Sequence, residues 1–244
     1  MIIVSLEDVY FSYRIMASNQ ASLKFFFKDL VRGKVKLENH EVINGISLKI
    51  TAGETLGIIG KNGAGKSTLL KILAGVIPPS SGKVVIPHNV APMIDLGAGF
   101  NPELTARENI LFYSSLLGRD LRVVKKRINE IGTWAGVTND LDHQLRTFSS
   151  GMVARLAFAT ATDTVPELLL VDEVLSVGDS EFALKSKRRM TEIISSGTTV
   201  AIVSHDLKTI AEITTRVIWL DGGRIVADGE PKDVITEYMM RFGK

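Results

Sequence analysis

Short apolar runs recur along the chain at the spacing of strands in a buried sheet. Residues 55–59, 168–171 and 199–203 are almost wholly apolar or small, which is the pattern of parallel strands that are covered on both faces. Two further apolar runs flank an Asp-Gly-Gly sequence that begins at Asp221, and this arrangement predicts a hairpin. The chain is therefore expected to contain a largely parallel central sheet.

Apolar residues at helical spacing follow the first of these strands. Leu69, Leu70 and Leu73 fall on one helix face, which predicts a helix there. Further helices are expected at residues 107–117, 121–134, 153–161 and 231–240. The alternation predicts one α/β domain over residues 1–244, with a core at about 1–93 and 166–244 and an inserted helical subdomain at about 94–165. The loop at 95–105 is rich in Gly and Pro and is a candidate hinge.

A glycine-rich stretch joins the first strand to its helix. Its sequence is Gly60-Lys61-Asn62-Gly63-Ala64-Gly65-Lys66-Ser67-Thr68. The three glycines let the backbone turn tightly and bring its N–H groups onto phosphate oxygens, and the helix that follows presents the positive end of its dipole. Lys66 can reach the β- and γ-phosphates, and Ser67 can ligate Mg²⁺. The pattern predicts a site for ATP or GTP.

Polar residues follow two other predicted strands. Asp172 and Glu173 end the strand at 168–171, and His205 comes soon after the strand at 199–203. The carboxyl ends of strands are where an open α/β sheet binds its ligands. Asp172 is therefore expected to hold Mg²⁺ through water, and Glu173 to polarise the attacking water. His205 is expected to touch the γ-phosphate and that water.

A second candidate anion site lies at the start of the helix expected over 153–161. Ser149, Ser150 and Gly151 offer small hydroxyl groups and backbone N–H groups at a helix N-terminus. One nucleotide does not need two such sites in one chain, whereas a head-to-tail pair does, because each copy then caps the nucleotide of its partner. The alternative interpretation is a plain serine helix cap.

The composition excludes several classes of function. The 244 residues include no cysteine, so disulfides, thiolate metal sites and cysteine nucleophiles are excluded. The net charge of +2 gives no reason to expect nucleic acid as a partner. No apolar run reaches the roughly 18 residues that a membrane span needs, and the N-terminus lacks the features of a signal peptide. We therefore expect a protein that stays in the cytosol and needs a partner for any work at a membrane.

These motifs stand in the order and spacing of an ABC-type ATPase, and the resemblance covers nearly the whole chain. It implies an α/β fold with an ABC-type P-loop ATPase core, a helical subdomain and an N-terminal antiparallel β part. It also implies that Tyr13 stacks on adenine and that Asp179 belongs to a loop that crosses the seam between two copies. ATP and Mg²⁺ are then the expected nucleotide and metal ion.

Three departures from the general pattern narrow the resemblance. The family's serine-glycine-glycine signature is here Ser149-Ser150-Gly151, and Val177-Gly178 stands where the crossing loop more often has alanine-leucine. The glutamine that usually follows the strand after the phosphate loop is missing. Asp95 is the nearest candidate to take the place of that glutamine at Mg²⁺. The set, with Leu-Gly-Ala-Gly-Phe at 96–100, resembles the ATPase subunits of bacterial polysaccharide exporters of the O-antigen and teichoic-acid type.

This resemblance implies a function. The chain would bind and hydrolyse ATP as a peripheral subunit at the cytoplasmic face of the inner membrane, and would drive a lipid-linked, O-antigen-like polysaccharide across it. Its expected partners are a second copy of itself, in a head-to-tail dimer around ATP, and a separate transmembrane permease. An exporter of teichoic acid, drugs or ions and a soluble ABC ATPase remain as alternatives. Because the sequence stops at Lys244, we expect no carbohydrate-binding domain after the ATPase.

The segment 14–41 is longer than a hairpin connection needs. Ser22 is placed to begin a short helix and Gly33 to end it. Leu23, Phe26, Phe27 and Leu30 would form one apolar stripe, with Phe25 and basic residues on the opposite side. The pattern over residues 21–33 therefore predicts either a surface helix packed on the core or an interfacial helix near lipid headgroups or the permease.

Overall fold

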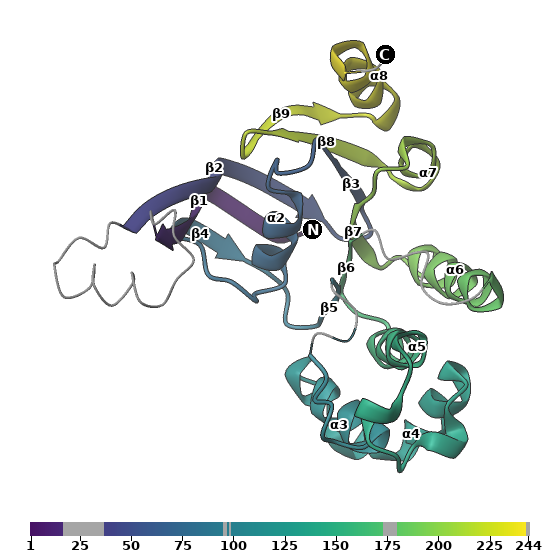
Figure 1. Ribbon diagram of the computed structural model, residues 1–244. Helices are drawn as coiled ribbons and strands as arrows, with labels where there is room; N and C mark the ends of the chain where they lie inside the picture. The colour runs from purple at the N-terminus through teal and green to yellow at the C-terminus, as the bar shows by residue number, and fades with distance from the viewer. Residues whose placement is uncertain (17–36, 95–96, 98, 173–179, 243–244) are drawn as a thin grey trace, which may run out of the picture.

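Two β-sheets with a helix between them form the part of the molecule that positions the phosphate loop (Figure 1). The computed structural model describes residues 1–16, 37–94, 97, 99–172 and 180–242. A three-stranded antiparallel sheet has the order β2-β1-β4, and a six-stranded sheet has the order β5-β6-β7-β3-β8-β9, in which only the β8–β9 pair is antiparallel. The strands are β1 (Ile2–Met16), β2 (Leu37–Thr51), β3 (Thr55–Ile59), β4 (Ser81–Val85), β5 (Val90–Met93), β6 (Leu168–Asp172), β7 (Thr199–Val203), β8 (Arg216–Asp221) and β9 (Arg224–Gly229).

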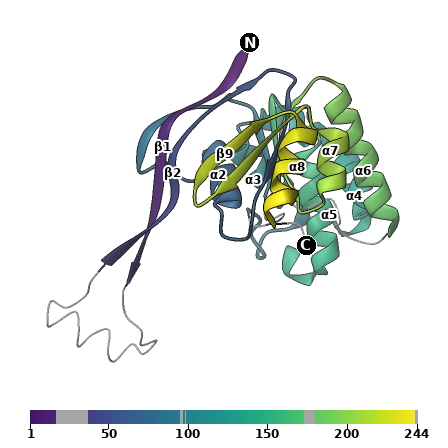
Figure 2. The ribbon, with the colours of Figure 1, turned by 90° about the horizontal axis from the view of Figure 1, so that it is seen from above.

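The helices fall into three groups around the larger sheet (Figures 1 and 2). Among the described residues, one helix lies between the two sheets, three lie on the opposite face of the large sheet, and three follow β5 at the far end of the molecule. In that order they are α2 (Lys66–Leu73); α6 (Ser180–Ser195), α7 (Leu207–Ile213) and α8 (Pro231–Phe242); and α3 (Ala106–Leu116), α4 (Leu121–Ala135) and α5 (Ser150–Ala161). Short 3-10 turns at Thr138–Asp140 and Leu145–Thr147 lead from α4 to α5.

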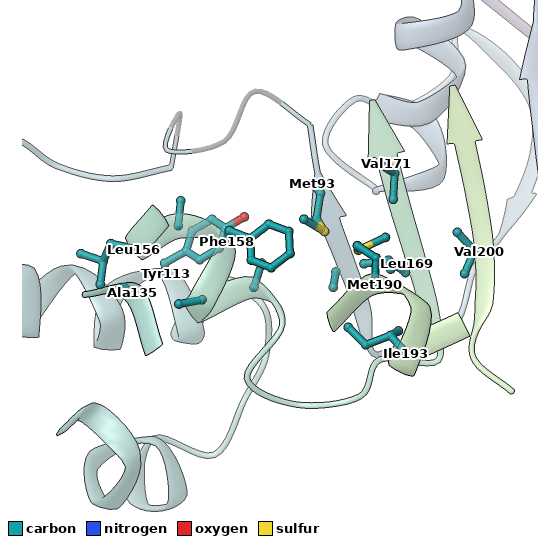
Figure 3. Packing of buried hydrophobic residues seen from close by; sticks show 14 of the residues in the cluster. Met93, Tyr113, Ala135, Leu156, Phe158, Leu169, Val171, Met190, Ile193 and Val200 are labelled. Atoms are coloured by element: carbon teal, nitrogen blue, oxygen red, sulfur yellow. The ribbon is translucent and has the colours of Figure 1, made fainter. Parts of the chain in front are cut away.

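The alternation of side chains along the central strands builds two cores. On β6, Leu168 and Leu170 join the core around α2, while Leu169 and Val171 join the core on the other face. Successive residues of a strand point to opposite faces, so an all-apolar strand supplies both layers. Figure 3 shows the second layer, where residues of α5 and α6 such as Phe158 and Met190 approach the strands.

The first hairpin is longer than the sequence indicates. Residues 14–16 and 37–41 belong to β1 and β2, with Arg14 opposite Asn39 and Met16 opposite Leu37. The expected loop from 14 to 41 was wrong at both ends, because the two strands continue to pair beyond the apolar residues that mark them. The predicted helix from Ser22 lies outside the described residues.

The other element predictions are confirmed with small shifts. The hairpin after Asp221 and the helix from Pro231 are present as β8, β9 and α8. The helix expected from Val153 begins three residues earlier, at Ser150, because its cap is Ser149. The helix expected from Arg107 begins at Ala106, where Thr105 and Glu108 form a reciprocal capping box.

Arginine side chains gather at the C-terminal end of α5. Arg119 donates to the carbonyl oxygens of Thr160 and Ala161, Arg189 donates to Thr162 O, and Arg127 donates to Asp163 O. Cations and N–H donors at this end satisfy the last carbonyl groups of a helix. The three arginines come from the α3–α4 connection, α4 and α6, so they tie α5 to its neighbours on both sides.

One arginine joins the two sheets. Arg216 of β8 pairs with Asp228 of β9 at 2.5 Å and with Glu54 at 3.0 Å, and it donates to the carbonyl oxygen of Lys49 in β2. The hydrogen bonds to Asp228 raise the pKa of the Arg216 guanidinium. The Glu54 side chain is only 9% exposed, so it depends on this partner for much of its charge compensation.

We predict that Arg216→Met lowers the free energy of unfolding by about 2 kcal/mol, because the Glu54 carboxylate loses its cation and the donor to Oε1, keeping only the hydrogen bonds from Thr51 to Oε2, and the Lys49 carbonyl loses its donor from Arg216. Arg224→Met is the matched control. Arg224 is exposed on the neighbouring strand β9, and its loss should change the free energy by less than about 0.5 kcal/mol. Urea denaturation of both variants measures the difference, and equal effects would contradict the role given to Arg216.

Candidate functional site

Close backbone contacts shape the glycine-rich loop between β3 and α2. Gly65 caps α2 in the left-handed region with φ of 100°, and a Cβ there would lie 2.8 Å from the carbonyl oxygen of Val42. A Cβ on Gly60 would collide with the carbonyl oxygen of Leu220. Only glycine fits both positions, because the neighbouring atoms are backbone and cannot move aside. The loop is therefore held between β2 and the end of β8.

Lys66 lies inside this loop. Its side chain is buried, with 8% of the residue exposed, and its Nζ atom donates to the carbonyl oxygens of Gly60 at 2.8 Å and Lys61 at 2.9 Å. The loop thus wraps around an ammonium group. The outer positions, Asn62, Gly63 and Ser67, are exposed, whereas Ala64 is buried and Thr68 is half-buried. A buried cation beneath an exposed glycine-rich backbone suits an anion such as a phosphate group.

The register of the large sheet brings two other predicted residues to the same edge. Ile58 of β3 pairs with Val203 of β7, which pairs with Asp172 of β6. Neighbouring strands are about 4.8 Å apart, so Asp172 stands about two strand spacings from the end of β3. His205 follows Val203 by two residues and is exposed. The phosphate loop, Asp172 and His205 therefore share the carboxyl edge of adjacent strands.

Asp206 shapes the turn that carries His205. It is the N-cap of α7, and it accepts hydrogen bonds from Lys208 N and the Thr209 hydroxyl. The hydrogen bond from Thr209 is the main reason that the pKa of the Asp206 carboxyl is lowered. This cap begins α7 directly after the histidine and so fixes where the chain leaves the sheet edge.

The two serines at the start of α5 have different positions in the helix. Ser149 is the N-cap residue, and its hydroxyl accepts from Met152 N at 3.3 Å. Ser150 and Gly151 are the first two residues of the helix, and Ser150 is exposed. No hydrogen bond or ion pair among the described residues links Ser150 to the phosphate loop. The structure therefore does not bring this predicted anion site together with the loop of the same chain.

The remaining predicted site residues lie on the three-stranded sheet or outside the described ranges. Tyr13 is on β1, is 43% exposed and packs edge-on against Phe11 at 4.8 Å between centroids. Its role against adenine stays a prediction. Glu173, Asp179 and Asp95 lie outside the described residues. Their roles in water activation, dimer contact and Mg²⁺ binding therefore stay predictions.

An open cavity of about 770 Å³ lies at the C-terminal end of α2. It is enclosed by the end of α2, the β4–β5 segment and the end of α3, and its lining includes Tyr13, Lys71 and Tyr113. Val76 and Leu116 expose 63% and 60% of their surface at its walls. Sequence reasoning missed this cavity, because its walls are far apart along the chain.

Sequence reasoning also missed an aromatic cluster next to the loop. Trp219, Tyr238 and Phe242 pack edge to face with centroids 5.4–5.6 Å apart. The spacing of Tyr238 and Phe242, four residues apart on one helix, is the signal that could have placed them on a common packing face. Nothing in the local sequence indicates that this face lies against the loop.

The fold and the glycine-rich loop define a P-loop domain of the ABC class. The family model of ABC transporters matches residues 43–176, which is more than half of the chain, and the chain belongs to this family. The likeness extends to a solved structure, a dimeric post-hydrolysis state of an ATP-binding cassette bound to ADP and Pi. That structure superposes with a TM-score of 0.70 at 22% identity, over 94% of this chain and 99% of the other, which confirms the predicted fold.

The more similar relatives confirm the narrower resemblance to the polysaccharide-exporter group. The O-antigen export system ATP-binding protein RfbB of Myxococcus xanthus is 39% identical over 240 residues, which are 96% of this chain and 55% of that protein. The teichoic acids export ATP-binding protein TagH of Enterococcus faecalis is 38% identical over 203 residues, which are 83% of this chain and 45% of that protein. The chain thus spans about half the length of these two relatives. Among the described residues, no helix has the length and apolar character of a membrane span.

We predict that Gly65→Ala weakens the binding of MgADP by at least about tenfold. The new Cβ would combine a left-handed backbone, which costs an L-residue about 1–2 kcal/mol, with a forced shift of the loop away from Val42, and 1.4 kcal/mol corresponds to tenfold in affinity.

Gly118→Ala is the control. Gly118 has a similar φ of 70° but open space around it, so its variant should lose stability and keep its affinity. Calorimetric titration and thermal unfolding separate the two effects. Equal affinity of both variants for MgADP would contradict the account of the loop.

Proposed function

We propose that this chain is the ATP-binding and ATP-hydrolysing subunit of an ABC exporter of lipid-linked polysaccharide. The observation that carries the proposal is the shared edge of β3, β7 and β6, where a glycine-rich loop around Lys66 stands beside Asp172 and His205. The names of the export-system relatives support the polysaccharide cargo. An O-antigen-like glycan is the first candidate and teichoic acid the second, since relatives of both kinds match over most of the chain.

The residues present suit a nucleotide with its metal ion. Ser67 is exposed next to the buried Lys66, and Asp172 ends β6 at the same edge of the sheet, so a hydroxyl and a carboxylate are available to a cation that is also bound by phosphate oxygens. Ser67 and Asp172 would hold Mg²⁺, with Asp95 in place of the missing glutamine. Bound Mg²⁺ supplies positive charge against the phosphate oxygens. Lys66 binds the phosphates, while Glu173 and His205 orient the attacking water.

A head-to-tail dimer completes this site. The Ser150 hydroxyl and the first N–H groups of α5 are exposed at a helix start, and they are not joined to the loop of the same chain. A second copy can bring them onto the open side of the phosphate loop, with Asp179 at the seam and two sites related by C2 symmetry. The dimer of the related cassette bound to ADP and Pi supports this arrangement.

We propose that the cavity beside α3 receives the transmembrane permease. Its exposed apolar walls at Val76 and Leu116 suit an amphipathic helix laid into a groove. The cavity lies between α2, which follows the phosphate loop, and α3, which belongs to the proposed helical subdomain at about 94–165. A permease helix bound there would contact both the core and that subdomain, and would therefore be displaced when the two move relative to each other. Peripheral attachment to the membrane, with a contribution from residues 21–33, completes the proposal.

Glu173→Gln tests the proposed hydrolysis. The variant should keep its affinity for ATP and lose turnover by a factor on the order of 10², the size expected for removal of a general base. Uncleaved ATP should then trap a dimer, which light scattering detects. Glu181→Gln, an exposed acid in the first turn of α6, is the control and should turn over ATP normally. Turnover by Glu173→Gln at near the wild-type rate would contradict the role of Glu173.

Ser150→Arg tests the dimer. It should leave nucleotide binding by the monomer intact and block ATP-driven dimerisation, because the exposed helix start would carry a bulky side chain. Ser149→Ala, at the neighbouring position, should instead act on stability, since loss of the hydrogen bond from Met152 N to the Ser149 hydroxyl costs about 1 kcal/mol.

A mixture of Ser150→Arg with Lys66→Ala chains gives the decisive result for the dimer. A head-to-tail pair of these two chains holds one complete site and one site damaged twice. The mixed dimer should therefore recover at most half of the normal activity. Full recovery would be incompatible with the proposed geometry.

A further inference from the structure

The last turn of α8 lies against the phosphate loop, in a contact that no motif assigns. Lys61, the second residue of the loop, holds its ammonium nitrogen 3.7 Å from the ring centroid of Phe242. Phe242 in turn packs against Trp219 and Tyr238, with centroids 5.6 and 5.4 Å away. Trp219 pairs across the sheet with Ile59, the last residue before the loop. The same aromatic cluster therefore supports the loop from its strand and from the side chain of Lys61.

A second cation, the Arg241 guanidinium, contacts two rings of the aromatic cluster. The Arg241 guanidinium lies 5.2 Å from the Trp219 centroid and 5.6 Å from the Phe242 centroid. Its Nη2 atom is 3.6 Å from a carboxylate oxygen of Asp221, at the end of β8. Phe242 thus contacts two cations, one from the phosphate loop and one from its own helix. This holds the last turn of α8 at the sheet edge where nucleotide is proposed to bind.

The backbone of Lys61 links this contact to the phosphate site. Its carbonyl oxygen accepts a hydrogen bond from Lys66 Nζ at 2.9 Å, alongside the carbonyl of Gly60. A cation whose hydrogen-bond partners are fixed in advance binds an anion with less loss of conformational freedom. We propose that Phe242 is a positioning residue for the phosphate loop: its ring holds Lys61, and the Lys61 carbonyl orients the Lys66 ammonium toward bound phosphate. The proposal rests on the nucleotide site proposed above.

A double-mutant cycle on MgADP binding tests this role in the full chain. Phe242→Leu keeps an apolar side chain and removes the ring, and the dissociation constant should rise about two- to fivefold, the size of an exposed cation–π contact. In a chain that already carries Lys61→Met, the same change should cause no further rise. Phe242→Tyr and Lys61→Arg keep a ring and a cation, and each should retain nearly the wild-type constant.

Thermal unfolding, measured on the same variants, separates positioning from packing. If Phe242 only stabilises α8, Phe242→Leu will lower the melting temperature and leave the dissociation constant unchanged, which overturns the proposal. An equal rise in the constant with and without Lys61→Met overturns it as well. If Phe242→Leu does not fold, equal constants for Lys61→Met and Lys61→Arg overturn it. Failure of the unmodified chain to bind MgADP would overturn the nucleotide site itself, whereas unchanged constants in the variants alone refute only the positioning role.

Discussion

The structure depends on a junction where three backbone segments meet around the carbonyl group of Val42. Any side chain on Gly65 of the phosphate loop or Gly223 of the β8–β9 turn would run into that group. Asn44 N also donates to Gly223 O at 2.8 Å. Backbone atoms cannot adopt another rotamer, so the junction sets the distance between the antiparallel sheet and the parallel sheet. The proposed phosphate site is therefore built from the contact between the two sheets and does not belong to one loop alone.

Local signals in the sequence predicted most of the fold, and long-range contacts explain what they missed. The phosphate loop and the strands beside it depend on residues within about ten positions, so spacing and apolar runs were sufficient. The length of the first hairpin depends on pairing between residues such as Arg14 and Asn39, which no local pattern reveals. The start of α5 was expected at Val153 and lies three residues earlier, because Ser149 caps the helix, and the apolar run that marked the helix begins only after its first turn.

The same distinction applies to the site. The motif predicted Lys66, but not that Nζ would be held by the carbonyls of Gly60 and Lys61. The sequence placed Asp172 and His205 at the carboxyl ends of strands but did not give the order of those strands. The pairing of Ile58 with Val203, and of Val203 with Asp172, supplies that order. Contacts that join β2 or α8 to the loop arise from tertiary packing.

The open side of the site explains why one chain is not expected to complete it. Asn62, Gly63 and Ser67 face solvent, so water has free access to any phosphate bound there, and hydrolysis under control requires that this access be limited. In the proposed dimer the exposed start of α5 supplies the matching half, and the arginines at its other end tie it to α4 and α6. Because Arg127 of α4 and Arg189 of α6 bind carbonyl groups that directly follow α5, a displacement of α5 would strain its contacts with both neighbours. Closure on a partner's nucleotide would therefore reach α6, which follows the segment that holds Glu173, and so would connect assembly of one site to the residues of the other.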